Sequence, residues 1–91
     1  MTFNIGETVI CSITVKDSTG ALANPATSMS IQITGYQGTV IQAYAAMTND
    51  STGAYHYDFD TASKQATDYI VYYKAVDGTR TSIATDTFKL V

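Results

Sequence analysis

The chain has 91 residues, of which 45% are hydrophobic and only 14% are charged, and its formal net charge is −3. This length favours one small domain, and the hydrophobic content is sufficient for a core, so the chain is not a disordered polyelectrolyte. The five Lys and Arg residues are scattered singly and no apolar stretch is long enough to span a bilayer. We therefore expect neither nucleic acid nor a membrane as a partner.

In the first half of the chain, apolar and polar residues alternate with period two, which is typical of half-buried strands. Residues 2–5 form a short segment of this kind. In residues 7–16, one face of the predicted strand carries Val9, Cys11, Ile13 and Val15. Asp17-Ser-Thr-Gly20 predicts a turn. In the next alternating segment, 28–34, the side chains that point to the core are Met29, Ile31 and Ile33. Both glycines of Gly35-Tyr-Gln-Gly38 can adopt positive φ, so a hairpin connection is expected there.

The second half of the chain continues the pattern. Residues 39–46 predict a strand of undefined phase, because both of its faces carry apolar residues, and Asn49-Asp-Ser-Thr-Gly53 predicts a turn. Residues 54–59 predict a strand with three aromatic residues on one face, Tyr55, Tyr57 and Phe59. A polar loop over 60–67 follows. The most hydrophobic strand, 68–76, places on one face Tyr69, Val71, Tyr73 and Ala75. Asp77-Gly78 predicts a tight turn into a last strand, 80–91.

About seven strands with turn signals every 8–12 residues predict an all-β fold. The expected architecture is an immunoglobulin-like or fibronectin-like antiparallel β-sandwich that forms a single domain over residues 1–91. Tyr69 stands near the start of the sixth strand, where such sandwiches often place a corner tyrosine. The antibody hallmarks are missing, because Val71 stands where the second cysteine would be and the chain has no Trp. Packing alone must therefore hold the domain together.

Several pieces of the chain resemble short immunoglobulin-like domains of tailed phages and prophages: GETVICSITVKDSTGAL (6–22), NPAT (24–27), GTV (38–40), AAMTNDSTGAYHYDF (45–59) and DGTRTSIATDTFKLV (77–91). The STGAYHY piece is also similar to a strand of macroglobulin-type and bacterial surface sandwiches. The resemblance implies a virion part, such as a capsid decoration, connector or tail accessory protein. It carries no catalytic motif and no defined set of binding residues.

The inventory of reactive groups is small, with one His, one Cys and one Glu. His56 shares a strand face with Asp58, which would suit acid–base or metal chemistry, but an exposed or interface histidine is the default expectation. Cys11 is expected to be a buried core thiol. A second polar group consists of Asn49, Asp50, Asp58 and Asp60. Calcium binding could explain it, but turn formation explains it better. We expect no catalytic residues, no cofactor and no bound metal.

One apolar surface is a candidate for partner binding. On the strand over 68–76, the face opposite the core carries Ile70, Tyr72 and Val76, where a monomer would place polar groups. Tyr36 at a hairpin tip is a second candidate, because it is a large amphipathic side chain on a loop. The alternative is that these residues pack under a loop or are exposed without consequence.

The small inventory of reactive groups predicts a non-enzymatic protein, and the resemblance to phage domains implies that it is a structural protein of a virion. Its expected partners are other virion proteins, namely capsid, connector or tail subunits, together with further copies of itself on the lattice. The N-terminus shows no secretory signal, which fits assembly in the host cytoplasm. The alternative is a microbial cell-surface module for adhesion or carbohydrate binding, which would need an export route, and an enzyme ranks last.

Overall fold

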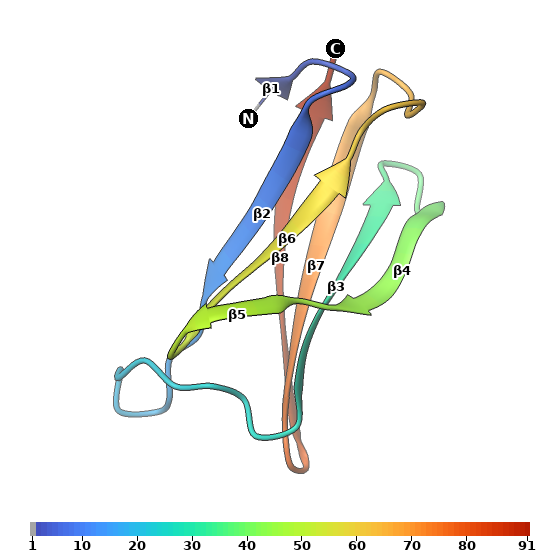
Figure 1. The fold of residues 1–91 in the computed structure, drawn as a ribbon. Coiled ribbons are helices and arrows are strands. Elements are labelled where there is room, and N and C mark those ends of the chain that lie inside the picture. Colours follow the sequence, from blue (N-terminus) through green and yellow to red (C-terminus); the bar gives the residue numbers. More distant parts are fainter. Residues whose placement is uncertain (1) are drawn as a thin grey trace.

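The structure, a computed structural model, describes residues 2–91 and consists of strands joined by turns and loops (Figure 1). The strands are β1 (Thr2–Phe3), β2 (Thr8–Thr14), β3 (Ser28–Gly35), β4 (Val40–Ala46), β5 (Thr48–Ser51), β6 (Ala54–Asp60), β7 (Asp68–Asp77) and β8 (Arg80–Leu90). The prediction of an all-β chain is confirmed for these residues.

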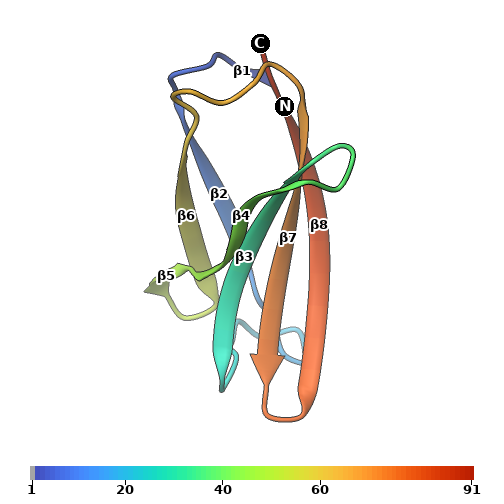
Figure 2. The ribbon, with the colours of Figure 1, turned by 90° about the vertical axis from the view of Figure 1, so that its right-hand side faces the viewer.

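The strands form two sheets that lie face to face (Figure 2). The five-stranded sheet has the order β1-β8-β7-β3-β4, and the three-stranded sheet has the order β2-β6-β5. All pairings are antiparallel except that of β1 with β8, which is parallel and joins Thr2 to Lys89 and Phe3 to Leu90. The long ladders of β7 with β3 and β8 make β7 the centre of the larger sheet. The fold is therefore a two-layer β-sandwich.

The number of strands differs from the prediction of seven, because β5 forms where the sequence predicted only a turn. Thr48 pairs with His56 and Asn49 pairs with Tyr55. All four residues of β5 are exposed, so this strand has no apolar face to reveal it in the sequence. The amide of Asn49 donates to the carbonyls of Ser51 and Ala54, at 2.7 and 3.1 Å, and this ties the ends of the β5–β6 hairpin together.

The core lies between the two sheets, and the predicted inward faces supply most of it. Along β2, β3 and β7 the odd-numbered side chains point inward, as expected from period-two alternation. Ile13, Val15, Tyr57 and Ala75 are half-buried at its margin. The buried hydrophobic side chains are Val9, Cys11, Met29, Ile31, Ile33, Met47, Tyr55, Phe59, Tyr69, Val71, Tyr73, Phe88 and Leu90.

Aromatic packing closes the end of the sandwich near β1. The rings of Tyr69 and Phe88 stack with centroids 5.3 Å apart, and Phe59 lies about 6 Å from both. The hydroxyl of Tyr69 donates to the backbone carbonyl of Gln65, four residues upstream, at 2.7 Å. This bond holds the loop over 61–67 against the start of β7.

The predicted hairpin between β3 and β4 is present, but only one of its two glycines has positive φ. Gly38 has φ of +90°, whereas Gly35 does not adopt this region and instead ends β3. The N–H of Gly35 donates to the carbonyl of Thr39 at 2.8 Å, and that of Gly38 donates to the carbonyl of Gly35 at 2.9 Å. The hairpin therefore needs the conformational freedom of glycine at one position only.

Candidate functional site

The outer face of the five-stranded sheet is the surface that carries most of the predicted partner-binding residues. Ile70, Tyr72 and Val76 all point to this face of the central strand β7, and each is half-buried. Polar neighbours flank them in the ladders: Thr87 and Thr34 beside Ile70, Thr85 and Gln32 beside Tyr72, and Thr81 and Ser28 beside Val76. The apolar residues thus form a narrow strip between rows of threonine, serine and glutamine.

Tyr36 lies at the tip of the β3–β4 hairpin, with 61% of its surface exposed. Its backbone N–H donates to the carbonyl of Asp68 at 3.2 Å, which holds the hairpin tip against the start of β7. Tyr36 and Ile70 line the same open hollow, together with Thr2, Thr87 and Lys89. The fold therefore brings these two predicted residues together, and Tyr72 follows two residues further along β7.

Val76 lies apart from this group. Six residues of extended strand separate it from Ile70, which corresponds to about 20 Å. Between them, Lys74 interrupts the apolar strip on the same face. The four predicted residues consequently make one compact group of three, formed by Tyr36, Ile70 and Tyr72, and one distant member.

Three exposed apolar residues near this face were not among the predicted ones. They are Ile83 of β8, and Val40 and Tyr44 of β4, with exposures of 57%, 52% and 38%. Ile83 pairs with Lys74, whose ammonium group lies 4.0 Å from the centre of the Tyr44 ring in a cation–π contact. A signal for Ile83 existed, since alternation counted back from the buried Leu90 places residue 83 on the outer face.

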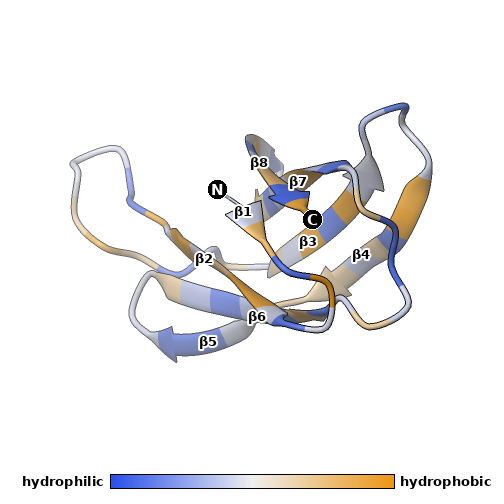
Figure 3. Cartoon of the chain, turned by 90° about the horizontal axis from the view of Figure 1, so that it is seen from above, coloured by the Kyte–Doolittle hydropathy of each residue, from blue (hydrophilic) through white to orange (hydrophobic). Residues whose placement is uncertain are grey.

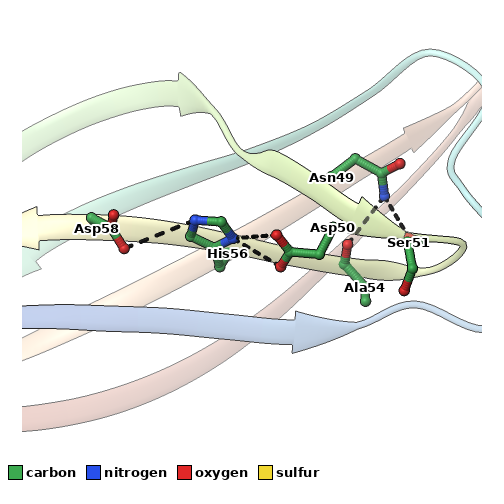
Figure 4. A network of polar contacts seen from close by, with 6 residues as sticks. All are labelled: Asn49, Asp50, Ser51, Ala54, His56 and Asp58. Atoms are coloured by element: carbon green, nitrogen blue, oxygen red, sulfur yellow. Dashed lines mark hydrogen bonds and ion pairs between the residues drawn. The ribbon is translucent and has the colours of Figure 1, made fainter.

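The outer face of the three-stranded sheet carries the single histidine (Figure 4). The Nδ1 atom of His56 lies 2.7 and 2.8 Å from the two carboxylate oxygens of Asp50 on β5, whereas Nε2 lies 4.0 Å from Asp58. The hydrogen bond to Asp50 raises the pKa of His56, and the charges of Asp50 and Asp58 act in the same direction. The contact with Asp50 therefore favours the protonated form of this half-buried ring.

The other polar groups considered from the sequence serve turns and loops. Asp60 accepts from the N–H of Ala62 at 2.9 Å, and Asn49 ties the β5–β6 hairpin. Within residues 2–91, no group of three or more His, Cys, Asp or Glu side chains is placed to hold a metal ion. Thr61, in the loop predicted to be polar, is fully buried. Its hydroxyl is nevertheless satisfied, since it accepts from the N–H of Gly6 and donates to the carbonyl of Glu7.

Cys11 is buried on the inner face of β2, as predicted. Burial raises the pKa of its thiol to about 11, and the nearby charges of Asp86 and Asp58 contribute in the same direction. A thiol with so high a pKa is almost entirely protonated at neutral pH, so it is a weak nucleophile in this state.

Residues 2–91 contain no helix with the length and apolar character that a membrane crossing requires. Comparisons of the chain with models of known protein families, with curated proteins and with solved structures gave no match. The function must therefore be argued from the residues and surfaces described above.

Proposed function

We propose that this chain is a non-enzymatic structural module of a virion that docks on a capsid, connector or tail lattice through the outer face of its five-stranded sheet. The observation that carries the proposal is the compact group of Ile70 and Tyr72, on the outer face of the central strand β7, with the exposed Tyr36 beside them. Val76 lies further along the same face, beyond Lys74. Aromatic and aliphatic side chains surrounded by a polar rim are typical of protein–protein interfaces.

We also propose that the sandwich is of the immunoglobulin-like class. The strand order supports this assignment, because a sheet of β8-β7-β3-β4 facing a sheet of β2-β6-β5 corresponds to the arrangement of strands in such domains. The hydrogen bond from Tyr69 to Gln65 supports it as well, since a corner tyrosine at this position binds backbone a few residues upstream.

The proposed mechanism is repeated contact. One small apolar strip supports only a weak interface, but a lattice offers many equivalent positions at a high effective concentration. The polar rows on either side of the strip, formed by threonines of β8 and by Ser28, Ser30 and Gln32 of β3, keep the free domain from presenting one large apolar patch.

The first test asks whether the domain is part of a particle. Cryo-microscopy of the virion that is produced with this chain should show the domain at regular, repeated positions, with the β7 outer face against a neighbouring subunit. Absence of the domain from the particle, together with binding of the free chain to glycans, would instead identify a carbohydrate-binding module.

The second test uses substitutions on the docking face. Ile70→Asp combined with Tyr72→Asp places two carboxylates on the apolar strip and is expected to abolish docking on particles while the domain remains folded, because an unpaired charge cannot enter an apolar interface at low cost. Thr48→Asp, on the exposed strand β5, is the matched control and should dock normally. Normal docking of the double variant would exclude this face.

A further inference from the structure

The three-stranded sheet ends in an unpaired strand. β2 pairs with β6 on one side only, and on its other side no strand of the described chain follows (Figure 3). β8, whose residues line a hollow together with β2, belongs to the other sheet, where it pairs with β7 and, near its end, with β1. The edge of β2 therefore offers backbone hydrogen-bonding groups to a further strand.

The hydrogen-bond phase of β2 identifies the residues that carry these free groups. Beyond one end of the strand, the N–H of Val15 donates to the carbonyl of Gly53 on the β6 side, and beyond the other end, the carbonyl of Glu7 accepts from Thr61, which follows β6. The register between β2 and β6 has no shift, so the odd-numbered residues between these points also bond to β6. The N–H and C=O groups of the even-numbered residues point to the open edge: Thr8, Ile10, Ser12 and Thr14.

This edge lacks the devices by which sheet edges normally avoid further pairing. β2 contains no charged residue and no proline, its pairing is regular, and Ile10 is 60% exposed. The other edges have such devices. β5 has four residues including Asp50, the β3–β4 pairing contains register shifts, and the free part of β8 carries Arg80 and Asp86.

We propose that β2 pairs antiparallel with β2 of a second copy of this chain, about a two-fold axis at Cys11, so that two three-stranded sheets become one continuous six-stranded sheet. This inference does not depend on the virion role. It concerns a different surface from the docking face and holds for the free protein in solution.

The register follows from parity and length. In an antiparallel pair the bonded residues exchange both hydrogen bonds, so even-numbered residues must face even-numbered residues of the second copy. Cys11 is the middle of the seven-residue strand, and an axis there is the one that pairs all four free residues. Ile10 then faces Ser12 of the second copy and Thr8 faces Thr14, which gives about eight backbone hydrogen bonds.

The side chains are compatible with this register. No charged residue faces a like charge along the paired segment, because β2 has none. At each end of the ladder, Glu7 of one copy faces Val15 of the other, next to Lys16, so the flanking charges are of opposite sign. The same surface patch is used on both copies, as a two-fold dimer requires.

Cys11 supplies a built-in reporter of the axis. In the proposed register Cys11 faces Cys11 of the second copy in a non-hydrogen-bonded pair, for which the Cα atoms are about 4.5 Å apart, within the range of disulfides. Cys11 is only 5% exposed, but it lines a small hollow together with Val71 of β7 and Phe88 of β8. Two thiols at this distance can be joined by an added oxidant.

The first experiment measures the oligomeric state. Sedimentation of the purified reduced chain, at concentrations up to about 1 mM, should show a species of twice the 9.8 kDa chain mass. Ser12→Pro removes one outward N–H without touching the bonds to β6 and should give a monomer, whereas Ser12→Ala keeps the N–H and should remain dimeric. A monomer for the unsubstituted chain at all concentrations would overturn the proposal, as would a dimer for folded Ser12→Pro.

A second set of variants covers the case in which Ser12→Pro fails to fold. Ile10→Lys with Ser12→Lys leaves the free chain unstrained, because both side chains are exposed, but places like charges opposite each other in the pair. This variant should be monomeric, and so should Ile10→Glu with Ser12→Glu, while a mixture of the two should dimerise. Dimers of either variant alone would contradict the register.

The third experiment tests the axis itself. Diamide takes up two electrons and two protons from a pair of thiols, which become a disulfide, and it should convert the unsubstituted dimer into a covalent dimer through Cys11. The reaction should accelerate towards alkaline pH, because the thiolate is the reacting form. Ser12→Ala should cross-link equally well, and Ser12→Pro should not. The measurement is made at an alkaline pH at which the domain is still folded. A dimer that is not cross-linked under this condition would place the axis elsewhere and overturn the proposed register.

Discussion

At the scale of single residues, the contact between His56 and Asp50 makes a prediction about protonation. Replacement Asp50→Asn removes the carboxylate that accepts the Nδ1 hydrogen bond, so the pKa of His56 should fall towards its ordinary value of 6.5. Because His56 is the only histidine, an NMR titration of its ring protons reports this pKa without ambiguity. Asp58→Asn is the control and should have a smaller effect, since Asp58 lies 4.0 Å from Nε2.

The same contact sets the direction of a stability change with pH. A histidine whose pKa is raised by folding stabilises the folded state fully below the pKa of the unfolded chain, and this contribution disappears as the pH rises through the folded pKa. The free energy of unfolding of the unsubstituted chain should therefore exceed that of Asp50→Asn more at pH 5 than at pH 9. Equal differences at both pH values would show that the pair has no linkage to folding.

The partner of His56 also shows where sequence reasoning stops at this scale. Asp58 was the expected neighbour, because it is two residues away on the same strand face, but the close contact comes from Asp50 on β5. That contact depends on the register between β5 and β6, which no apolar pattern specifies. The burial of Cys11 and Val71 could be predicted, since their neighbours at i±2 are also apolar and share the inner face.

At the scale of elements, the β5–β6 hairpin depends on Gly53. This residue has φ of +74°, and a Cβ atom there would lie 2.6 Å from the carbonyl oxygen of Val15 and 3.0 Å from the amide nitrogen of Ala23. Gly53→Ala should therefore lower the free energy of unfolding by about 2 kcal/mol or more, because backbone strain and a backbone clash add together. Urea unfolding followed by tyrosine fluorescence measures this loss.

Gly20 provides the matched control for this substitution. It also has positive φ, +87°, but nothing lies within 4 Å of an added Cβ. Gly20→Ala should cost only the conformational term, about 1 kcal/mol. If the two substitutions were equally costly, the close approach of Gly53 to the segment after β2 would not be present in solution.

A strand could be predicted from the sequence when one of its faces is much more buried than the other. β2, β3 and β7 each bury one face more deeply than the other, so period-two alternation identified them and their phase. β4 has exposed apolar residues on both faces, Val40 and Ile41 among them, and its pairing with β3 contains register shifts. Its phase was therefore undefined in the sequence, and fully exposed β5 was missed altogether.

At the scale of the whole molecule, the two proposed surfaces lie on different sheets. The proposed docking strip, formed by Tyr36, Ile70 and Tyr72, belongs to the outer face of the five-stranded sheet. The dimer would form through the edge of the three-stranded sheet. Pairing through β2 leaves Tyr36, Ile70 and Tyr72 uncovered, so a dimer would present two docking strips. Two linked strips bind a lattice more tightly than one, because the second contact is intramolecular.

The sandwich itself is tested by moving one charge between neighbouring positions of β7. Val71 is only 2% exposed and faces the other sheet, whereas Ile70 is half-buried on the outer face. Val71→Asp should unfold the domain or cost more than about 4 kcal/mol, since it leaves an unpaired carboxylate among core side chains, while Ile70→Asp should cost less than about 2 kcal/mol. Urea unfolding at neutral pH compares the two variants, with a folded far-UV spectrum for Ile70→Asp as the check on structure. Neighbouring residues of a strand point to opposite faces of the sheet. Similar losses in the free energy of unfolding for both variants would therefore mean that β7 does not have one face in the core and one face outside it. The proposed docking surface on the outer face would then not exist.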